Sequence, residues 1–210
     1  MSFAAQRDDL ADRLARHHDL ASRVVDAIRA VPRHEFVPDD RREAAYADRP
    51  LPIGHGQTVS APHAVALIAD HLALRAGETV LEVGTGCGYH AAVTAELVGP
   101  ANVYSVEYVA DLAERARENL ADTGYGDVHV RHGDGHDGWP DGAPYDAAYL
   151  TCAAADIPDA VRDQTRTGGR VLAPIDDGVS QDLVLADVTD DGLERTSLSR
   201  VRFVSMQGGA

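Results

Sequence analysis

Three glycines occupy alternate positions in the segment VLEVGTGCGYHAAV, at Gly84, Gly86 and Gly88. Glycine lets the backbone turn tightly and approach a ligand closely, because it has no Cβ atom. A loop of this kind after an apolar strand lies at the edge of an open α/β sheet where ligands bind. Dinucleotide-binding sequences place the third glycine three positions after the second, whereas Gly88 follows Gly86 by two. The spacing therefore predicts a cofactor loop and disfavours a nicotinamide-dependent oxidoreductase.

Two acidic positions downstream complete a pattern typical of S-adenosylmethionine-dependent enzymes. Glu107 ends the apolar segment NVYSVE, roughly 20 residues beyond the loop, and a carboxylate there can accept both hydroxyls of a ribose. Asp134 and Gly135 follow a third apolar segment, where methyltransferases commonly contact the adenine ring. We therefore expect S-adenosylmethionine as cofactor and S-adenosylhomocysteine as product; the alternative makes the glycines ordinary turn residues and Glu107 a solvated strand end. The predicted cofactor-binding residues of this region are Glu82, Gly84, Thr85, Gly86, Gly88, Glu107, Asp134 and Gly135.

Histidine and cysteine residues raise two other chemistries, and the pattern disfavours both. His132 and His136 flank Asp134, and two histidines with an aspartate are ligands that zinc accepts. No further ligand-like spacing accompanies them, so we predict no metal. Cys152 has no identifiable partner base, and a small packed thiol is its expected role.

The chain is strongly acidic, with a formal net charge of −15, and all 19 of its basic residues are arginine. Such a surface repels phosphate backbones and anionic lipids, so neither nucleic acid nor a membrane is an expected partner. Acidity without lysine also suits molar salt, where the Debye length falls to about 3 Å and self-repulsion is screened. A GC-rich genome would explain the missing lysine but not the acidity, so we expect a halophilic archaeal host.

Composition and the N-terminal sequence indicate a cytoplasmic protein, which we expect to be a monomer. With 44% hydrophobic and 25% charged residues, the chain has the balance of an ordinary globular protein. No stretch approaches the roughly 20 apolar residues that span a bilayer, and the segment MSFAAQRDDLADR lacks the apolar centre of a secretory signal. Cys87 and Cys152 are too few for a disulfide framework and are expected as thiols.

Strand-like and helical segments alternate from residue 61 to residue 175. This alternation predicts an α/β fold with a doubly wound, mainly parallel sheet of the Rossmann-like type. After it, strand-like segments at 181–188 and 195–204 flank a turn at Asp190-Asp191-Gly192, which predicts antiparallel edge strands.

The first sixty residues form a predicted N-terminal helical arm. Apolar residues at helical spacing predict one amphipathic helix over the first thirty residues, ended by Pro32. Prolines and glycines then predict a mostly irregular but ordered arm up to Ser60, with one helical turn around residues 41–46. We predict one domain, with the arm at 1–60, the cofactor-binding core at 61–175 and the C-terminal strands at 176–210.

The segment GHGQTVSAPHAVA, residues 54–66, resembles the region that marks the protein-L-isoaspartate (D-aspartate) O-methyltransferase family. The likeness continues through VPRHEFVP, AYADRPLPIG, GDGHDGWP, TCAAADIP and VRFV, and covers most of the chain from about residue 20. The resemblance implies a repair enzyme that methylates the α-carboxyl of L-isoaspartyl residues in damaged proteins and peptides, which are its expected partners. It further implies that Ser60 is the active-site residue, that Thr58 lines the methyl-transfer pocket with it, and that His63 and Gln181 bind the cofactor.

A small hydroxyl side chain suits this reaction. An ionised carboxylate needs no base to displace a methyl group from a sulfonium, so catalysis rests on alignment at about 3–3.5 Å and on exclusion of water. The Ser60 hydroxyl can orient one carboxylate oxygen without competing as a base. A second interpretation makes Ser60 the N-cap of a helix that begins at Ala61, and the two are compatible.

The chain departs from the family pattern at several positions. Cys87 stands where a serine is usual, His90 where a glutamine is commoner and Asp156 where a proline is common, and the closing MQGGA is less apolar than the usual ending. Two alternative functions remain: a methyltransferase of the same fold that acts on another carboxylate or a small molecule, and a non-catalytic module that recruits a partner protein. The GQTVS segment argues against the first, and the intact glycine loop with Glu107 and Ser60 argues against the second.

Overall fold

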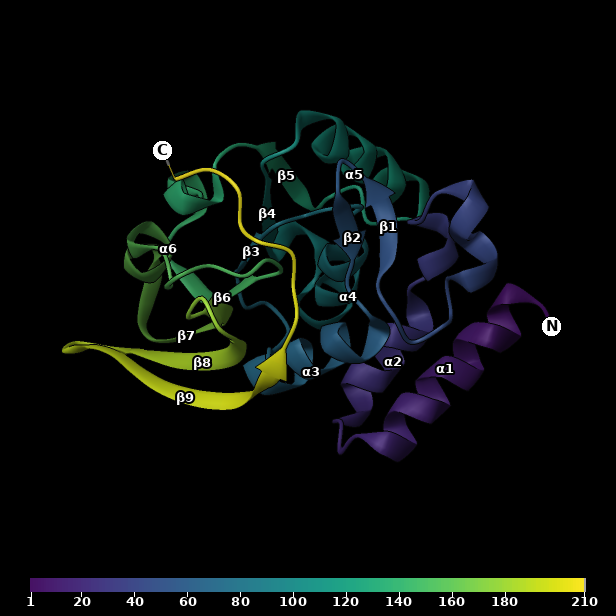
Figure 1. Cartoon of the computed structure of the whole chain (residues 1–210), viewed down its shortest axis with the longest axis horizontal. Helices are drawn as coiled ribbons and strands as arrows, with labels where there is room; N and C mark the ends of the chain where they lie inside the picture. Colours follow the sequence, from purple (N-terminus) through teal and green to yellow (C-terminus); the bar gives the residue numbers. More distant parts are fainter. Residues whose placement is uncertain (210) are drawn as a thin grey trace.

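A seven-stranded sheet forms the centre of the computed structural model, which describes residues 1–209 (Figure 1). The strand order is β5-β4-β3-β6-β7-β8-β9; the five strands from β5 to β7 pair in parallel, whereas β8 and β9 are antiparallel additions at one edge. This arrangement confirms the predicted doubly wound sheet and its antiparallel edge. The strands are β3 (Val80–Val83), β4 (Val103–Glu107), β5 (His129–His132), β6 (Tyr145–Leu150), β7 (Thr165–Asp176), β8 (Gln181–Thr189) and β9 (Gly192–Val201).

Helices cover both faces of the sheet because its central strands are apolar on both sides. Alternate residues of the strands separate into two hydrophobic clusters: Val80 packs in the larger one with the helices α1 to α5, and Leu81 packs in the smaller one with α6. No helix in residues 1–209 is long and apolar enough to cross a membrane. The helices of this part of the chain are α3 (Pro62–Leu72), α4 (Tyr89–Val98), α5 (Ala110–Asp122) and α6 (Asp159–Gln164).

The N-terminal arm contains two helices, α1 (Phe3–His17) and α2 (Ser22–Ala30), where the sequence predicts one. His18 and Ala21 are extended, and the Asp70 carboxylate of α3 accepts a hydrogen bond from the Ala21 N–H at 2.8 Å. The break lets each helix turn its own apolar stripe onto the core, which one continuous helix could not do. The single-helix prediction is therefore wrong, because a tertiary contact outweighs a continuous helical pattern.

The rest of the arm is more regular than predicted. A 3₁₀ helix at Asp39–Ala44 takes the place of the expected helical turn, and β1 (Leu51–Gly54) pairs antiparallel with β2 (Gln57–Val59) in a hairpin that the sequence did not reveal. The hairpin leads directly to Ser60 and α3, so it fixes the entry of the GQTVS segment into the core.

The chain beyond β9 returns across the carboxyl ends of the central strands (Figure 1, yellow). The Ala153 N–H donates to the Val204 carbonyl and the Met206 N–H donates to the Ala153 carbonyl, both at 2.8 Å. β9 ends at Val201, three residues earlier than expected, because the segment from Val204 to Met206 bonds to the loop after β6.

Candidate active site

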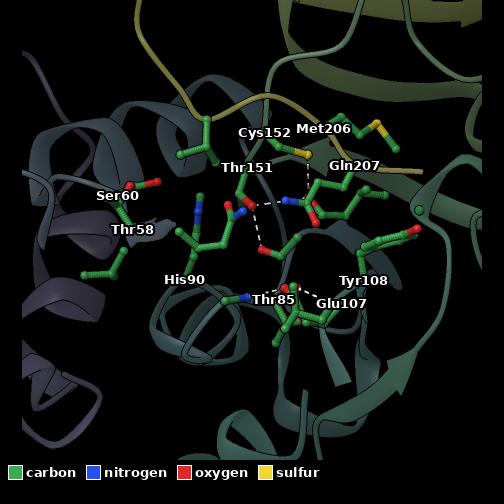
Figure 2. A pocket seen from close by; sticks show the side chains of 18 of the residues that line it. Thr58, Ser60, Thr85, His90, Glu107, Tyr108, Thr151, Cys152, Met206 and Gln207 are labelled. Atoms are coloured by element: carbon green, nitrogen blue, oxygen red, sulfur yellow. Dashed lines mark hydrogen bonds between the residues drawn. The ribbon is translucent and has the colours of Figure 1, made fainter. Parts of the chain in front are cut away.

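An open cavity lies beyond the carboxyl ends of β3, β4 and β6. Figure 2 shows Thr58 and Ser60 on one side of it and Glu107 and Tyr108 on the other. This is the edge of a doubly wound sheet at which small molecules bind. Its lining consists of Gln57, Thr58, Val59, Ser60, Val83, Gly84, Thr85, Gly86, Cys87, Tyr89, His90, Val106, Glu107, Tyr108, Val109, Gly135, Thr151, Cys152, Val204, Ser205, Met206 and Gln207.

The glycine loop forms the floor of the cavity. Gly84 has a φ of +100°, and a Cβ atom there would overlap the Thr151 hydroxyl. The Gly84 N–H donates to the Val106 carbonyl at 2.8 Å, so the loop is tied to the neighbouring strand β4. The sequence needs glycine at this position both for its backbone conformation and for the close approach of the loop after β6.

Glu107, the last residue of β4, presents a carboxylate that the backbone already orients. Its Oε2 accepts from the Gly86 N–H at 2.8 Å and its Oε1 accepts from the Val109 N–H at 2.9 Å. Burial raises the pKa of this carboxyl, while the backbone donors oppose the rise. Each oxygen keeps a second lone pair for a further donor, so the pair suits a vicinal diol.

A buried polar network lies beneath the loop. Glu82 accepts a hydrogen bond from the Tyr149 hydroxyl at 2.9 Å and another from Ser105, which in turn bonds Thr85. Burial raises the pKa of Glu82 to about 8, so its carboxyl is protonated at neutral pH. Glu82 is 0% exposed and does not line the cavity, so the structure corrects its predicted role from cofactor contact to support of the loop.

Thr58, Ser60, Thr151 and Val204 line a second cavity as well as the first, so the two cavities meet at these residues. The predicted N-cap role of Ser60 is wrong: α3 begins at Pro62, and its N-cap is Ala61. The second cavity is lined by Pro50, Thr58, Ser60, Ala61, His63, Ala64, Thr151, Arg200, Val201, Arg202, Phe203 and Val204.

A buried arginine holds Ser60 in place. Arg33 is 0% exposed, and its guanidinium donates to the carbonyls of Ser60 at 2.9 Å and of Ala45 at 3.0 Å. The same guanidinium lies over the ring of Tyr89, at 5.3 Å from the centroid. Burial lowers the pKa of Arg33. The side chain therefore joins the arm, the GQTVS segment and the first turn of α4.

Besides Glu82, four more of the predicted cofactor residues lie outside the first cavity. His63 faces the second cavity, where its backbone N–H and its Nδ1 both contact the Asp48 carboxylate at 2.9 Å. The Gln181 amide oxygen accepts from the Phe203 N–H at 2.6 Å, so this residue anchors the returning chain. His63 thus borders the second cavity, whereas Gln181 lines neither cavity.

The other two, Asp134 and Gly88, have local structural roles. Asp134 accepts from the His136 N–H at 2.9 Å, while the neighbouring Gly135 does line the cavity. Gly88, with a φ of +90°, is the N-cap of α4, and a Cβ atom there would crowd Leu120 of α5.

The sequence reasoning missed several lining residues. Thr151 and Cys152 directly follow β6, and their place at the carboxyl end of a central strand could have indicated them. The segment Val204–Gln207 contains no sequence motif that would indicate a site. Tyr108 and His90 were not predicted to line the cavity either.

The remaining candidate chemistries find no support in the geometry. Among residues 1–209, no group of three or more histidine, cysteine, aspartate or glutamate side chains is placed to hold a metal ion. His132 contacts the Tyr108 carbonyl through Nε2 at 3.1 Å, and the His136 ring pairs with Asp134. Burial raises the pKa of Cys152 to about 12, so it remains a thiol.

The sheet topology, the glycine loop and the backbone-oriented carboxylate of Glu107 are those of S-adenosylmethionine-dependent methyltransferases. The chain superposes on a solved protein-L-isoaspartate O-methyltransferase with a TM-score of 0.88 and 30% identity, over 96% of this chain and 66% of that one. A second solved structure, a Plasmodium falciparum protein described as a putative protein-L-isoaspartate O-methyltransferase in complex with S-adenosyl-L-homocysteine, gives a TM-score of 0.84. It shares 25% identity, over 96% of this chain and 98% of that one.

The sequence comparisons narrow this class to one family. The sequence profile of the protein-L-isoaspartate(D-aspartate) O-methyltransferases matches residues 5–210. Protein-L-isoaspartate O-methyltransferase 2 of Archaeoglobus fulgidus is 49% identical over 99% of this chain and 95% of its own. The Methanothermobacter thermautotrophicus protein-L-isoaspartate O-methyltransferase is 47% identical over 97% of this chain and 95% of its own. The chain belongs to the protein-L-isoaspartate(D-aspartate) O-methyltransferase family, whose cofactor is S-adenosylmethionine.

Proposed function

We propose that this enzyme transfers a methyl group from S-adenosylmethionine to the α-carboxyl of L-isoaspartyl residues in damaged proteins and peptides. The observation that carries the proposal is the meeting of two cavities at Thr58 and Ser60. One cavity has the loop and carboxylate expected of a cofactor site, and the other is a groove between the arm and the returning chain. A methyl donor in the first and a peptide carboxylate in the second would face each other across these two hydroxyl side chains.

The residues of the first cavity fit the cofactor. Glu107 would accept the two ribose hydroxyls, and Gly84 and Gly86 leave room for close approach, since a Cβ atom on either would crowd a neighbour. Gly135 and Met206 provide a narrow wall on the side of β5, suited to an adenine ring. Thr85 also faces the cavity, whereas Glu82 and Gly88 hold the loop from outside it.

The chain itself contributes alignment and exclusion of water to the reaction. When bound, S-adenosylmethionine supplies an electrophilic methyl group on a sulfonium sulfur. The carboxylate oxygen forms the new bond to carbon while the carbon–sulfur bond breaks, and the electron pair of that bond stays on the sulfur. No proton moves, so Ser60 and Thr58 act by orienting the carboxylate. The segment Val204–Gln207 covers the site from the other side and keeps water out.

The second cavity suits an extended peptide. It runs between α3 and the segment after β9, and Arg200 and Arg202 give its wall positive charge in an otherwise acidic protein. These groups would attract the carboxylates of an isoaspartyl site, while His63 is held by Asp48 at the opposite wall. Backbone groups of the returning chain would accept many peptide sequences, as a repair enzyme requires.

We also infer a cytoplasmic, monomeric enzyme adapted to high salt, with neither nucleic acid nor membrane as partner. The support is the net charge of −15 with arginine as the sole cationic side chain apart from histidine. Activity and thermal stability should both rise between about 0.1 M and molar potassium chloride, because salt at about a 3 Å Debye length screens the self-repulsion. Stability that is the same at both salt concentrations would contradict the adaptation.

The test compares an isoaspartyl peptide with its aspartyl twin as acceptor of radiolabelled methyl groups in high potassium chloride. We expect base-labile label on the isoaspartyl peptide alone. Ser60→Ala should lower kcat about 10- to 100-fold, the loss expected for one hydrogen bond to a charged group. Ser60→Ala should leave the affinity for S-adenosylhomocysteine nearly unchanged, and Ser197→Ala, on the exposed side of β9, provides the matched control.

Two results would overturn parts of the proposal. If neither peptide is labelled while S-adenosylhomocysteine still binds, the acceptor is another carboxylate or a small molecule. If the Ser60→Ala enzyme keeps the rate of the wild type, the meeting point of the cavities is not the site of transfer.

A further inference from the structure

His90 is a buried polar side chain with no partner at the wall of the first cavity. It is 5% exposed, and neither Nδ1 nor Nε2 has a hydrogen-bond partner among the described residues. The other buried side-chain atoms without a partner in residues 1–209 are all arginine Nε atoms. A buried group left unpaired costs free energy, so native proteins almost always satisfy such groups with protein, water or ligand.

The neighbours of His90 fix the orientation of its ring but give it no hydrogen bond. Its ring packs against that of Tyr149, with 4.5 Å between centroids and 35° between planes, so its orientation is fixed. The Tyr149 hydroxyl bonds both Thr94 and Glu82, and that network is satisfied without any contribution from His90. His90 therefore stands apart from the polar network of the core and lies among the side chains that line the cavity (Figure 2).

The N-terminus of α4, the helix that carries His90, lies at the first cavity. α4 begins at Tyr89 after Gly88, and no side chain caps it. Within α4, the first N–H to bond back is that of Ala92, to the Gly88 carbonyl at 3.0 Å. The N–H groups of His90 and Ala91 therefore point out of the helix end, while that of Tyr89 faces the Cys87 sulfur. Such an end favours an anion, both through its N–H groups and through the helix dipole.

The arrangement of the cavity indicates which part of the cofactor meets His90. Glu107, Tyr108 and Gly135 come from the ends of β4 and β5, and the ribose and adenine would lie on their side. His90, at the start of α4, lies away from those strand ends and lines the cavity together with Thr58 and Ser60. That leaves the amino-acid end of the cofactor for this part of the cavity.

We propose that His90, together with the uncapped N-terminus of α4, binds the α-carboxylate of the methionine moiety of S-adenosylmethionine. The proposal builds on the cofactor placement given above and is independent of the peptide substrate. Burial lowers the pKa of His90 to about 3, so the ring is neutral and offers one N–H donor and one acceptor nitrogen. The donor suits the carboxylate, and the acceptor suits the adjacent ammonium group.

The test uses two ligands that differ only at the proposed contact. S-adenosylhomocysteine carries the amino-acid end, and 5′-methylthioadenosine has the same adenosine and thioether without it. Isothermal titration of wild type and His90→Phe should show about tenfold or greater loss of affinity for S-adenosylhomocysteine. Affinity for 5′-methylthioadenosine should change less than about twofold, because the ring shape and the Tyr149 contact are kept.

Further variants separate binding from folding. His90→Gln keeps a donor and an acceptor and should retain most of the affinity for S-adenosylhomocysteine, whereas His90→Leu should behave like His90→Phe. Without ligand, His90→Phe should unfold at the temperature of the wild type or above it, because the variant removes an unpaired buried group. His129→Phe alters another ring-packed histidine, at 4.4 Å from Tyr104 and outside both cavities, and should change neither affinity.

Two outcomes would overturn the assignment. Parallel loss of affinity for both ligands in His90→Phe would mean that the residue only shapes the wall. Unchanged affinity for S-adenosylhomocysteine would mean that water, not the cofactor, satisfies the ring. Because the wild-type titration does not involve a peptide, failure of this test is distinct from failure of the isoaspartyl assay.

Discussion

Replacement of Glu82 by glutamine should change how the stability of this enzyme depends on pH. Burial raises the folded-state pKa of Glu82 from 4.5 to about 8. Because the folded pKa lies above the unfolded one, the stabilising contribution of the protonated carboxyl is full below about pH 4.5. It is lost as the pH rises through about 8. Each pKa unit corresponds to about 1.4 kcal/mol, so the difference across this window is on the order of 4–5 kcal/mol.

A glutamine at position 82 has nearly the same shape as the glutamic acid that it replaces, and its side chain does not titrate. Its amide oxygen can accept from the Tyr149 hydroxyl, as the acid does. Its NH2 group cannot accept the bond that Ser105 donates to the acid, but it can donate to the Ser105 hydroxyl, which can then donate to Thr85. We therefore expect Glu82→Gln to gain stability relative to wild type as the pH rises from about 5 to about 8, by up to about 1.4 kcal/mol per pH unit, with no further gain above that.

Urea unfolding of both proteins at half-unit intervals from pH 5 to pH 9 measures this difference. Thr94→Ser, which keeps a hydroxyl for Tyr149 and leaves Glu82 intact, provides a control whose pH profile should follow the wild type. A stability difference between Glu82→Gln and wild type that does not vary with pH would refute the reasoning, since Glu82 would then ionise normally in the folded protein.

Three further predictions concern the cavity. Glu107→Gln should weaken binding of S-adenosylhomocysteine about 10- to 100-fold by calorimetry, because an amide cannot accept through both of its ends; unchanged affinity would contradict the role of this carboxylate. Gly84→Ala should lower the free energy of unfolding by about 1–3 kcal/mol through backbone strain and overlap with Thr151, and adding Thr151→Ala should restore part of the loss. If the double variant is no more stable than Gly84→Ala, the overlap is not the cause. Iodoacetamide should label Cys87 and Cys152 far more slowly in the folded than in the unfolded protein at pH 8.5, because burial raises their pKa values to about 11 and about 12; equal rates by mass spectrometry would show that the thiols are exposed.

The core of the fold was predictable because its signals are local. Apolar strands, helical spacing and the Gly84 turn each follow from neighbouring residues, and the alternation of elements then limits the topology to a parallel sheet. α5 (Ala110–Asp122) is an example, because the buried residues that define its apolar face recur at helical spacing within its own segment. The place of Glu107 was predictable for the same reason, because it depends only on where its own strand ends.

The structure of the N-terminal arm and of residues 204–207, which cover the site, was harder to predict, because contacts between residues far apart in the sequence determine it. The break before Ala21 depends on the Asp70 carboxylate, and the position of Ser60 depends on the buried Arg33. Nothing in the local sequence encodes these partners. Glu82 was predicted to contact the cofactor, yet its strand turns it toward Tyr149 beneath the glycine loop. In a strand buried on both faces, periodicity alone does not say which face a side chain takes.

The return of residues 204–207 to the loop after β6 has a consequence for synthesis of the enzyme. A chain emerges from the ribosome N-terminus first and can begin to fold as it emerges. The hairpin that carries Thr58 and Ser60 and the glycine loop are then available early, but the opposite wall of the cavity is made after all the strands. Since Ala153 pairs with that late segment, a nascent chain halted after β8 would hold its methyl-transfer site open to water. The enzyme thus becomes competent only after residues 204–207 have been made and have closed this wall of the cavity.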